Sequence, residues 1–128
     1  MSSNQNTRRS HKWNFINLDH LQEIAEGNDG FFIEMMEVFK IESVNCLQRM
    51  NDQFQKKDFF ALSKTVHAMK PTGTYIGANS LTALMSRLER KISSGDDHEI
   101  GTLLNEVELL LKSVNNEIEE YLSSVIKN

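Results

Sequence analysis

Apolar residues recur at alternating spacings of three and four along most of the chain that follows Phe15. Such spacing places the apolar side chains on one face of a helix, because an α-helix completes a turn about every 3.6 residues. The clearest run consists of Ile100, Leu103, Leu104, Val107, Leu111, Val114, Ile118 and Leu122. No segment shows the period-two alternation that is typical of a strand, and the chain contains a single proline. The pattern therefore predicts long amphipathic helices and no sheet.

Capping and helix-breaking residues divide this pattern into five predicted helices. A short helix covers Leu18–Glu26, and four longer helices cover about 28–56, 58–76, 81–92 and 98–125. Because each long helix must bury its apolar stripe, we expect an all-α fold: an antiparallel four-helix bundle with a short additional N-terminal helix. Residues 15–128 are predicted to form this one domain, and residues 1–14 a disordered polar tail.

Composition excludes several classes of protein. The formal net charge of −4 argues against a nucleic-acid binder, because such proteins are generally basic. No apolar run is long enough to span a bilayer, and the first residues lack the apolar stretch of a signal peptide. The single cysteine, Cys46, lies in a helical pattern and is expected to be a buried apolar residue. We therefore expect a cytoplasmic protein that contacts neither membrane nor nucleic acid.

His67 is the histidine whose position on a predicted helix is most informative. It lies about 130° around the helix from the apolar stripe of its segment, and so should face solvent. The residues predicted to share its face are Phe60, Ser63, Lys64, Lys70, Pro71 and Thr74. His11, His20 and His98 lack such surroundings, and no pair of histidines has metal-ligand spacing. An ordinary solvated histidine without a function remains an alternative interpretation of this pattern.

An exposed imidazole beside two lysines has a definite chemical capacity. A neutral ring nitrogen can attack phosphorus and hold the phosphoryl group as a phosphoramidate. Lys70, and as a second candidate Lys64, would stabilise the added negative charge. The chain lacks a phosphate-binding loop of the GxxxxGK[ST] type, so it should not bind ATP through that motif. These features would suit a phosphoryl acceptor, and they argue against a kinase that binds ATP through that loop.

The segment His67–Ala78 reads HAMKPTGTYIGA. It resembles the signature of histidine phosphotransfer (HPt) domains, which typically have His-x-Leu-Lys-Gly-Ser-Ser, then three residues that usually end in an apolar one, and then Gly-Ala or a close variant. The histidine, the lysine and the closing Ile-Gly-Ala stand at matching spacings. Two departures lie on the histidine face: Pro71 replaces a glycine, and Thr74 stands where a small residue is common. Pro71 cannot donate a hydrogen bond to the carbonyl of His67, so we expect a kink or a loosened turn there.

The resemblance implies a two-component phosphorelay in which His67 is the phosphoacceptor. Receiver domains of response regulators or hybrid histidine kinases would be the partners, and each would bring its own aspartate and Mg²⁺. This chain would bind no cofactor and no metal, and a monomer is the default for such a module. The receiver would land on the side chains around His67, which are Phe60, Ser63, Pro71 and Thr74. Exposed apolar residues nearer the N-terminus, such as Ile24 or Phe31, could extend this surface.

Three other interpretations fit the same sequence. The chain could be a helical interaction module that binds receivers without carrying phosphate, or a receiver regulator that has kept only the fold. It could also be the phosphotransfer segment of a larger histidine kinase, although the starting methionine and the short C-terminus favour a free-standing domain. Phosphotransfer assays separate the first two from the carrier.

Overall fold

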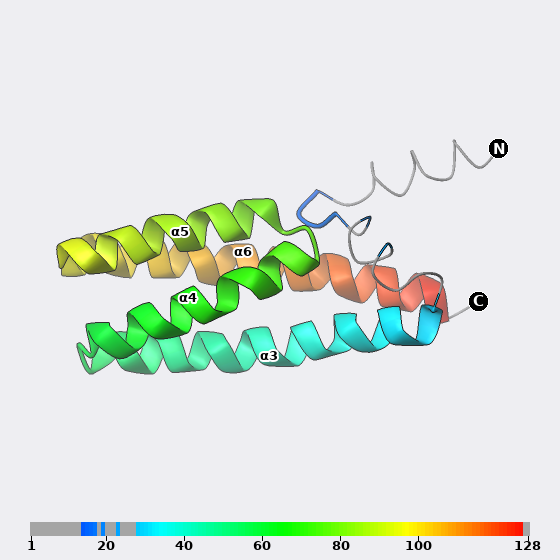
Figure 1. Cartoon of the computed structure of the whole chain (residues 1–128), viewed down its shortest axis with the longest axis horizontal. Helices are drawn as coiled ribbons and strands as arrows, with labels where there is room; N and C mark the ends of the chain where they lie inside the picture. The colour runs from blue at the N-terminus through cyan, green and yellow to red at the C-terminus, as the bar shows by residue number, and fades with distance from the viewer. Residues whose placement is uncertain (1–13, 18, 20–22, 24–27, 127–128) are drawn as a thin grey trace.

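Four helices form the part of the chain that the structure describes. The computed structural model describes residues 14–17, 19, 23 and 28–126. The helices are α3 (Asp29–Gln55), α4 (Phe59–Tyr75), α5 (Asn79–Ser94) and α6 (Asp97–Ile126). Each packs against the two helices beside it, in the closed order α3, α4, α5 and α6 (Figure 1). No strand occurs among these residues, so the predicted all-α four-helix bundle is confirmed. The predicted helix Leu18–Glu26 lies mostly outside the described residues.

Local capping explains why these helices begin where they do. The side chain of Asn28 accepts a hydrogen bond from the backbone of Phe31 at 2.9 Å, and that of Asp58 accepts one from Ala61 at 3.1 Å. Asp96 does the same for Glu99 at the start of α6. These bonds satisfy backbone N–H groups that a helix start leaves without partners. The predicted boundaries of the long helices are therefore correct to within a few residues.

The apolar stripes meet in one core. The whole α6 run from Ile100 to Leu122 that the apolar pattern indicated is buried. Buried side chains also line one face of α5 and of α4: Leu81, Leu84, Met85, Leu88 and Ile92, and Leu62, Val66 and Met69. Phe54 of α3 and Phe59 of α4 are only partly buried, and their rings contact each other near the α3–α4 connection. Two further residues of α6, Glu117 and Tyr121, are buried although the apolar pattern does not include them. The ring of Tyr121 meets that of Phe32 edge to face, with centroids 5.3 Å apart.

Glu117 is buried because it anchors the segment that precedes the bundle. Its carboxylate accepts hydrogen bonds from the backbone N–H groups of Asn14, Phe15 and Ile16, at 2.7, 2.8 and 3.2 Å. These bonds compensate for the loss of water around a buried charge. Asn14 was assigned to the polar tail, and its backbone contact with Glu117 attaches it to the bundle. The predicted disorder of the tail concerns residues that, apart from Asn14, lie outside the described part of the chain.

The segment that Glu117 binds has a second contact, with the turn between α4 and α5. The backbone N–H of Asn17 donates to the carbonyl of Ile76 at 3.1 Å. Gly77 has a φ of +69°, and a Cβ at this position would lie 2.1 Å from the carbonyl oxygen of Asn17. Only glycine allows both this backbone conformation and this close approach. Ile76, which directly follows α4, therefore contacts the segment that precedes the bundle.

Replacing Gly77 by alanine should destabilise the protein by more than the strain of a left-handed residue. Gly95 is a matched control, since its φ is +80° and an added Cβ would have nothing within 4 Å. Gly95→Ala should cost about 1–2 kcal/mol. Gly77→Ala should cost at least about 1 kcal/mol more, because the clash also disturbs the hydrogen bond from Asn17 to Ile76. Urea unfolding of both variants measures the difference, and equal losses would contradict the close contact.

Candidate functional site

The side chain of His67 projects from the middle of α4 into solvent. It is 72% exposed, whereas its neighbours Val66 and Met69 are buried in the core. The helical period thus turns the imidazole away from the stripe, and the prediction that His67 faces solvent is confirmed. A position of this kind leaves the ring open to a second protein.

A carboxylate from α5 holds the His67 ring. The Nδ1 atom of His67 lies 2.8 Å from Oε2 of Glu89, and Nζ of Lys70 lies 3.0 Å from Oε1 of the same carboxylate. Glu89 therefore joins the histidine and the lysine, which lie one turn apart on α4. The other ring nitrogen, Nε2, has no hydrogen-bond partner among the residues that the structure describes. It is the ring atom that remains available for chemistry.

The electrostatics of this cluster keep Glu89 ionised. The hydrogen bond from Lys70 holds the pKa of the Glu89 carboxyl below its usual value, and the contact with His67 acts in the same direction. Partial burial opposes both effects but does not reverse them. An ionised carboxylate can only accept hydrogen bonds, so Nδ1 of His67 must be the donor in this contact.

The two lysines predicted beside His67 have different surroundings. Lys70 is bound to Glu89, and its side chain is 26% exposed. The ammonium group of Lys64 instead lies over the ring of Phe60, 4.4 Å from its centroid, in a cation–π contact. Only Lys70 therefore belongs to the cluster around Glu89 in the resting protein.

The predicted landing face surrounds the histidine on the outer surface of α4. Phe60 is 73% exposed, Pro71 and Thr74 are exposed, and Ser63 is partly buried. The hydroxyl of Thr74 donates to the carbonyl of Lys70 at 3.2 Å. The α-helix continues through Pro71 as far as Tyr75, so the proline does not end it.

The apolar residues proposed to extend this face can be placed only in part. Phe31, near the start of α3, is 38% exposed. Ile24 lies outside the described residues. The extension toward the N-terminus therefore remains a prediction that rests on Phe31.

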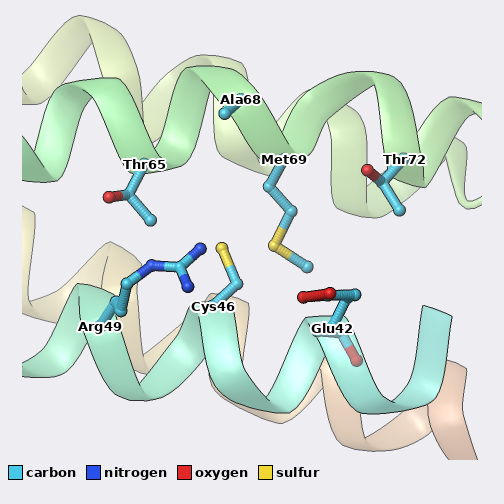
Figure 2. A pocket seen from close by; sticks show the side chains of 8 residues that line it. Glu42, Cys46, Arg49, Thr65, Ala68, Met69 and Thr72 are labelled. Carbon is cyan, nitrogen blue, oxygen red and sulfur yellow. The ribbon is translucent and has the colours of Figure 1, made fainter. Parts of the chain in front are cut away.

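A separate cleft lies between α3 and α4, and His67 does not line it (Figure 2). Figure 2 shows Cys46 and Arg49 of α3 facing Thr65 and Met69 of α4. Burial raises the pKa of the Cys46 thiol, and the nearby guanidinium of Arg49 only partly opposes this effect. Cys46 is thus a buried thiol without activation, in agreement with the sequence-based expectation.

The described residues contain no group of three or more acidic, histidine or cysteine side chains that could hold a metal ion. Within the same part of the chain, no helix combines the length and the apolar character that crossing a bilayer requires.

Glu89 is the site residue that the sequence analysis missed. It is the only acidic residue of α5, and it directly follows Leu88 of the apolar stripe. A lone carboxylate at the border of a stripe is a weak signal, because most such residues simply face water. Its importance follows only from the packing of α5 against α4, which brings it to His67.

Comparison with known proteins agrees with the geometry. A family model described as the Hpt domain matches residues 34–123, which is well over half of the chain. The crystal structure of a rice protein described as a histidine-containing phosphotransfer protein superposes with a TM-score of 0.81 at 13% sequence identity, covering 95% of this chain and 88% of the rice chain. At this identity the likeness concerns the fold alone. No curated protein matches the chain. Because the family model covers α4, α5 and most of α3 and α6, the chain belongs to the Hpt domain family.

Proposed function

We propose that this protein is a phosphoryl carrier of a two-component phosphorelay. It accepts a phosphoryl group on His67 from the aspartate of one receiver domain and passes it to the aspartate of another. The observation that carries this proposal is the His67 ring, which is exposed while Glu89 holds Nδ1 and leaves Nε2 open. Membership of the Hpt family supports the same conclusion. The carrier acts in the cytoplasm and has no kinase activity or ATP site of its own.

The chemistry needs two proteins. The lone pair of Nε2 attacks phosphorus, the bond from phosphorus to the aspartate oxygen breaks, and the electron pair of that bond returns to the carboxylate. Phosphoryl transfer depends mainly on positioning and on neutralisation of charge. The receiver supplies its Mg²⁺ and its own residues, and this chain supplies the nucleophile and a nearby ammonium group. Lys70 stabilises the phosphoryl group, and Lys64 is a more distant second candidate.

The receiver lands on the outer face of α4. Phe60, Ser63, Pro71 and Thr74 surround His67 on this face, and a protein that brings an aspartate to Nε2 must cover them. Phe60 offers a large exposed aromatic ring, which is a side chain that protein interfaces favour. The alternative, in which the chain binds receivers without carrying phosphate, uses the same surface and differs only in the fate of His67.

Replacing His67 by glutamine should abolish the transferable label while leaving the fold intact. An exposed side chain contributes little to packing. The free energy of unfolding, measured by thermal melting, should therefore change by less than about 0.5 kcal/mol. His98→Gln is the matched control, since His98 is an exposed histidine on α6. Incubation with a phosphorylated receiver should give an acid-labile, alkali-stable label on the parent and the control only. Undiminished labelling of His67→Gln would refute the assignment, and an unlabelled parent that still binds the receiver would favour the interaction module.

Replacing Lys70 by alanine should slow transfer roughly five- to tenfold at low ionic strength, because a partly exposed ammonium group contributes about 1 kcal/mol. Lys64→Ala is the matched control, and it should slow transfer less because its ammonium lies over Phe60. The difference should shrink at high salt, which screens exposed charges. Rapid-quench measurement of transfer tests this, and a parental rate for Lys70→Ala would exclude the role.

Replacing Thr74 by arginine should weaken receiver binding without unfolding the protein. Thr74 lies about 10 Å along the helix axis from His67 and nearly in line with it. A long cation there would obstruct close approach and would touch no buried side chain. Receiver binding should fall at least about tenfold by titration calorimetry, whereas labelling by a small donor such as phosphoramidate should equal that of the parent. Parental affinity of this variant would place the landing site elsewhere.

A further inference from the structure

One carboxylate at the site binds two partners on the neighbouring helix. Glu89 of α5 contacts Nδ1 of His67 through Oε2 and Nζ of Lys70 through Oε1. We propose that Glu89 is a positioning residue that keeps a proton on Nδ1 of His67 throughout the transfer cycle and so limits how long His67 retains its phosphoryl group. This inference rests on the proposed function, because it concerns the same histidine.

The first step of the argument is the choice of tautomer. A carboxylate offers only acceptors, so a contact of 2.8 Å between oxygen and Nδ1 requires the proton to reside on Nδ1. The lone pair of a neutral ring then lies on Nε2, which points to solvent. A glutamine in the same place could either accept from Nδ1 or donate to it, and would leave the tautomer undetermined. The carboxylate therefore selects the nucleophilic atom.

The second step is the charge of the phosphorylated ring. When Nε2 forms its bond to phosphorus, the ring becomes an imidazolium that still carries the proton on Nδ1. The negative charge of Glu89 compensates this positive charge at hydrogen-bonding distance. When the phosphoryl group leaves, the electron pair of the phosphorus–nitrogen bond returns to Nε2, and the neutral Nδ1–H tautomer is restored. No proton has to move in either direction.

The third step links the proton to the lifetime of the phosphoramidate. A protonated ring departs as neutral imidazole, whereas an unprotonated ring would have to depart as an anion. Protonation at Nδ1 therefore makes the phosphorus–nitrogen bond easier to break. By favouring the protonated ring, Glu89 keeps the phosphoryl group transferable and shortens its storage.

The surrounding charges do not replace Glu89 in this role. On α4, Lys70 binds the carboxylate itself and helps to keep it ionised, as the lowered pKa of Glu89 indicates. Lys64 lies over Phe60 instead. On α5, Arg90 is exposed, and Lys91 pairs with Glu99 of α6. Among the described residues of α3 and α6, no charged group contacts the Glu89 carboxylate.

The test compares the parent with Glu89→Gln, which keeps the size of the side chain and removes its charge. Each chain is labelled by a phosphorylated receiver and separated from it, and hydrolysis of the label is followed between about pH 5 and pH 8. The midpoint is the pH at which the rate of hydrolysis reaches half of its maximum in acid. For Glu89→Gln this midpoint should lie about 0.5–1 pH unit lower than for the parent. At pH values above both midpoints, this shift corresponds to a label that lasts about three to ten times longer. Glu99→Gln, which removes an equal charge at the Lys91 pair, should match the parent.

The outcomes separate this inference from the proposed function. An unlabelled parent would defeat the proposed function, and a labelled parent whose midpoint equals that of Glu89→Gln would defeat only the role of Glu89. A folded Glu89→Gln chain that accepts no label would also overturn the inference, because Nε2 should still react. Nitrogen NMR of the unphosphorylated protein gives a second, independent check. It should show the Nδ1–H tautomer of His67 in the parent and a larger share of the Nε2–H tautomer in Glu89→Gln, and an Nε2–H tautomer in the parent would refute the inference.

Discussion

Burial of four apolar stripes against one another is the constraint on which the rest of this structure depends. Each helix covers its stripe with the two helices beside it, and the core residues of all four are shielded from water together. The burial fixes the rotation of every helix about its axis, because turning one helix would expose its stripe. The outward direction of His67 is a consequence of this rotation rather than of any contact that His67 makes itself.

The site shows how little local machinery a phosphoryl carrier needs. His67, Lys70 and Glu89 lie on the surface of two adjacent helices. In the proposed transfer the receiver would supply the metal and further catalytic groups, so this chain would have to present one nitrogen in a defined protonation state. A single carboxylate on a neighbouring helix meets that requirement, and Lys70 keeps the carboxylate charged. In the proposed relay the same lysine would thus act on the site before a phosphoryl group arrives.

The N-terminal segment follows a different rule from the bundle. Its attachment depends on backbone hydrogen bonds to Glu117 and on the close approach that Gly77 permits. Among the described residues of this segment, only Ile16 contributes a buried apolar side chain. Neither contact has a periodic signature. The helical pattern therefore predicted the helices, but Asn14 was assigned to the disordered tail, and nothing in the sequence indicated a buried glutamate. A helical period is visible among residues that lie close together in the chain, whereas the hydrogen bonds to Glu117 join residues about a hundred positions apart.

The sequence by itself determined the number and extent of the long helices, the buried stripes and the outward position of His67. These properties depend on local spacing and on capping residues such as Asn28 and Asp58, which act within a few residues of themselves. Only the tertiary structure decided that Glu89 of α5 meets His67 and Lys70 of α4. The axial offset between two packed helices depends on the packing of many core side chains at once, and no short stretch of sequence contains that information.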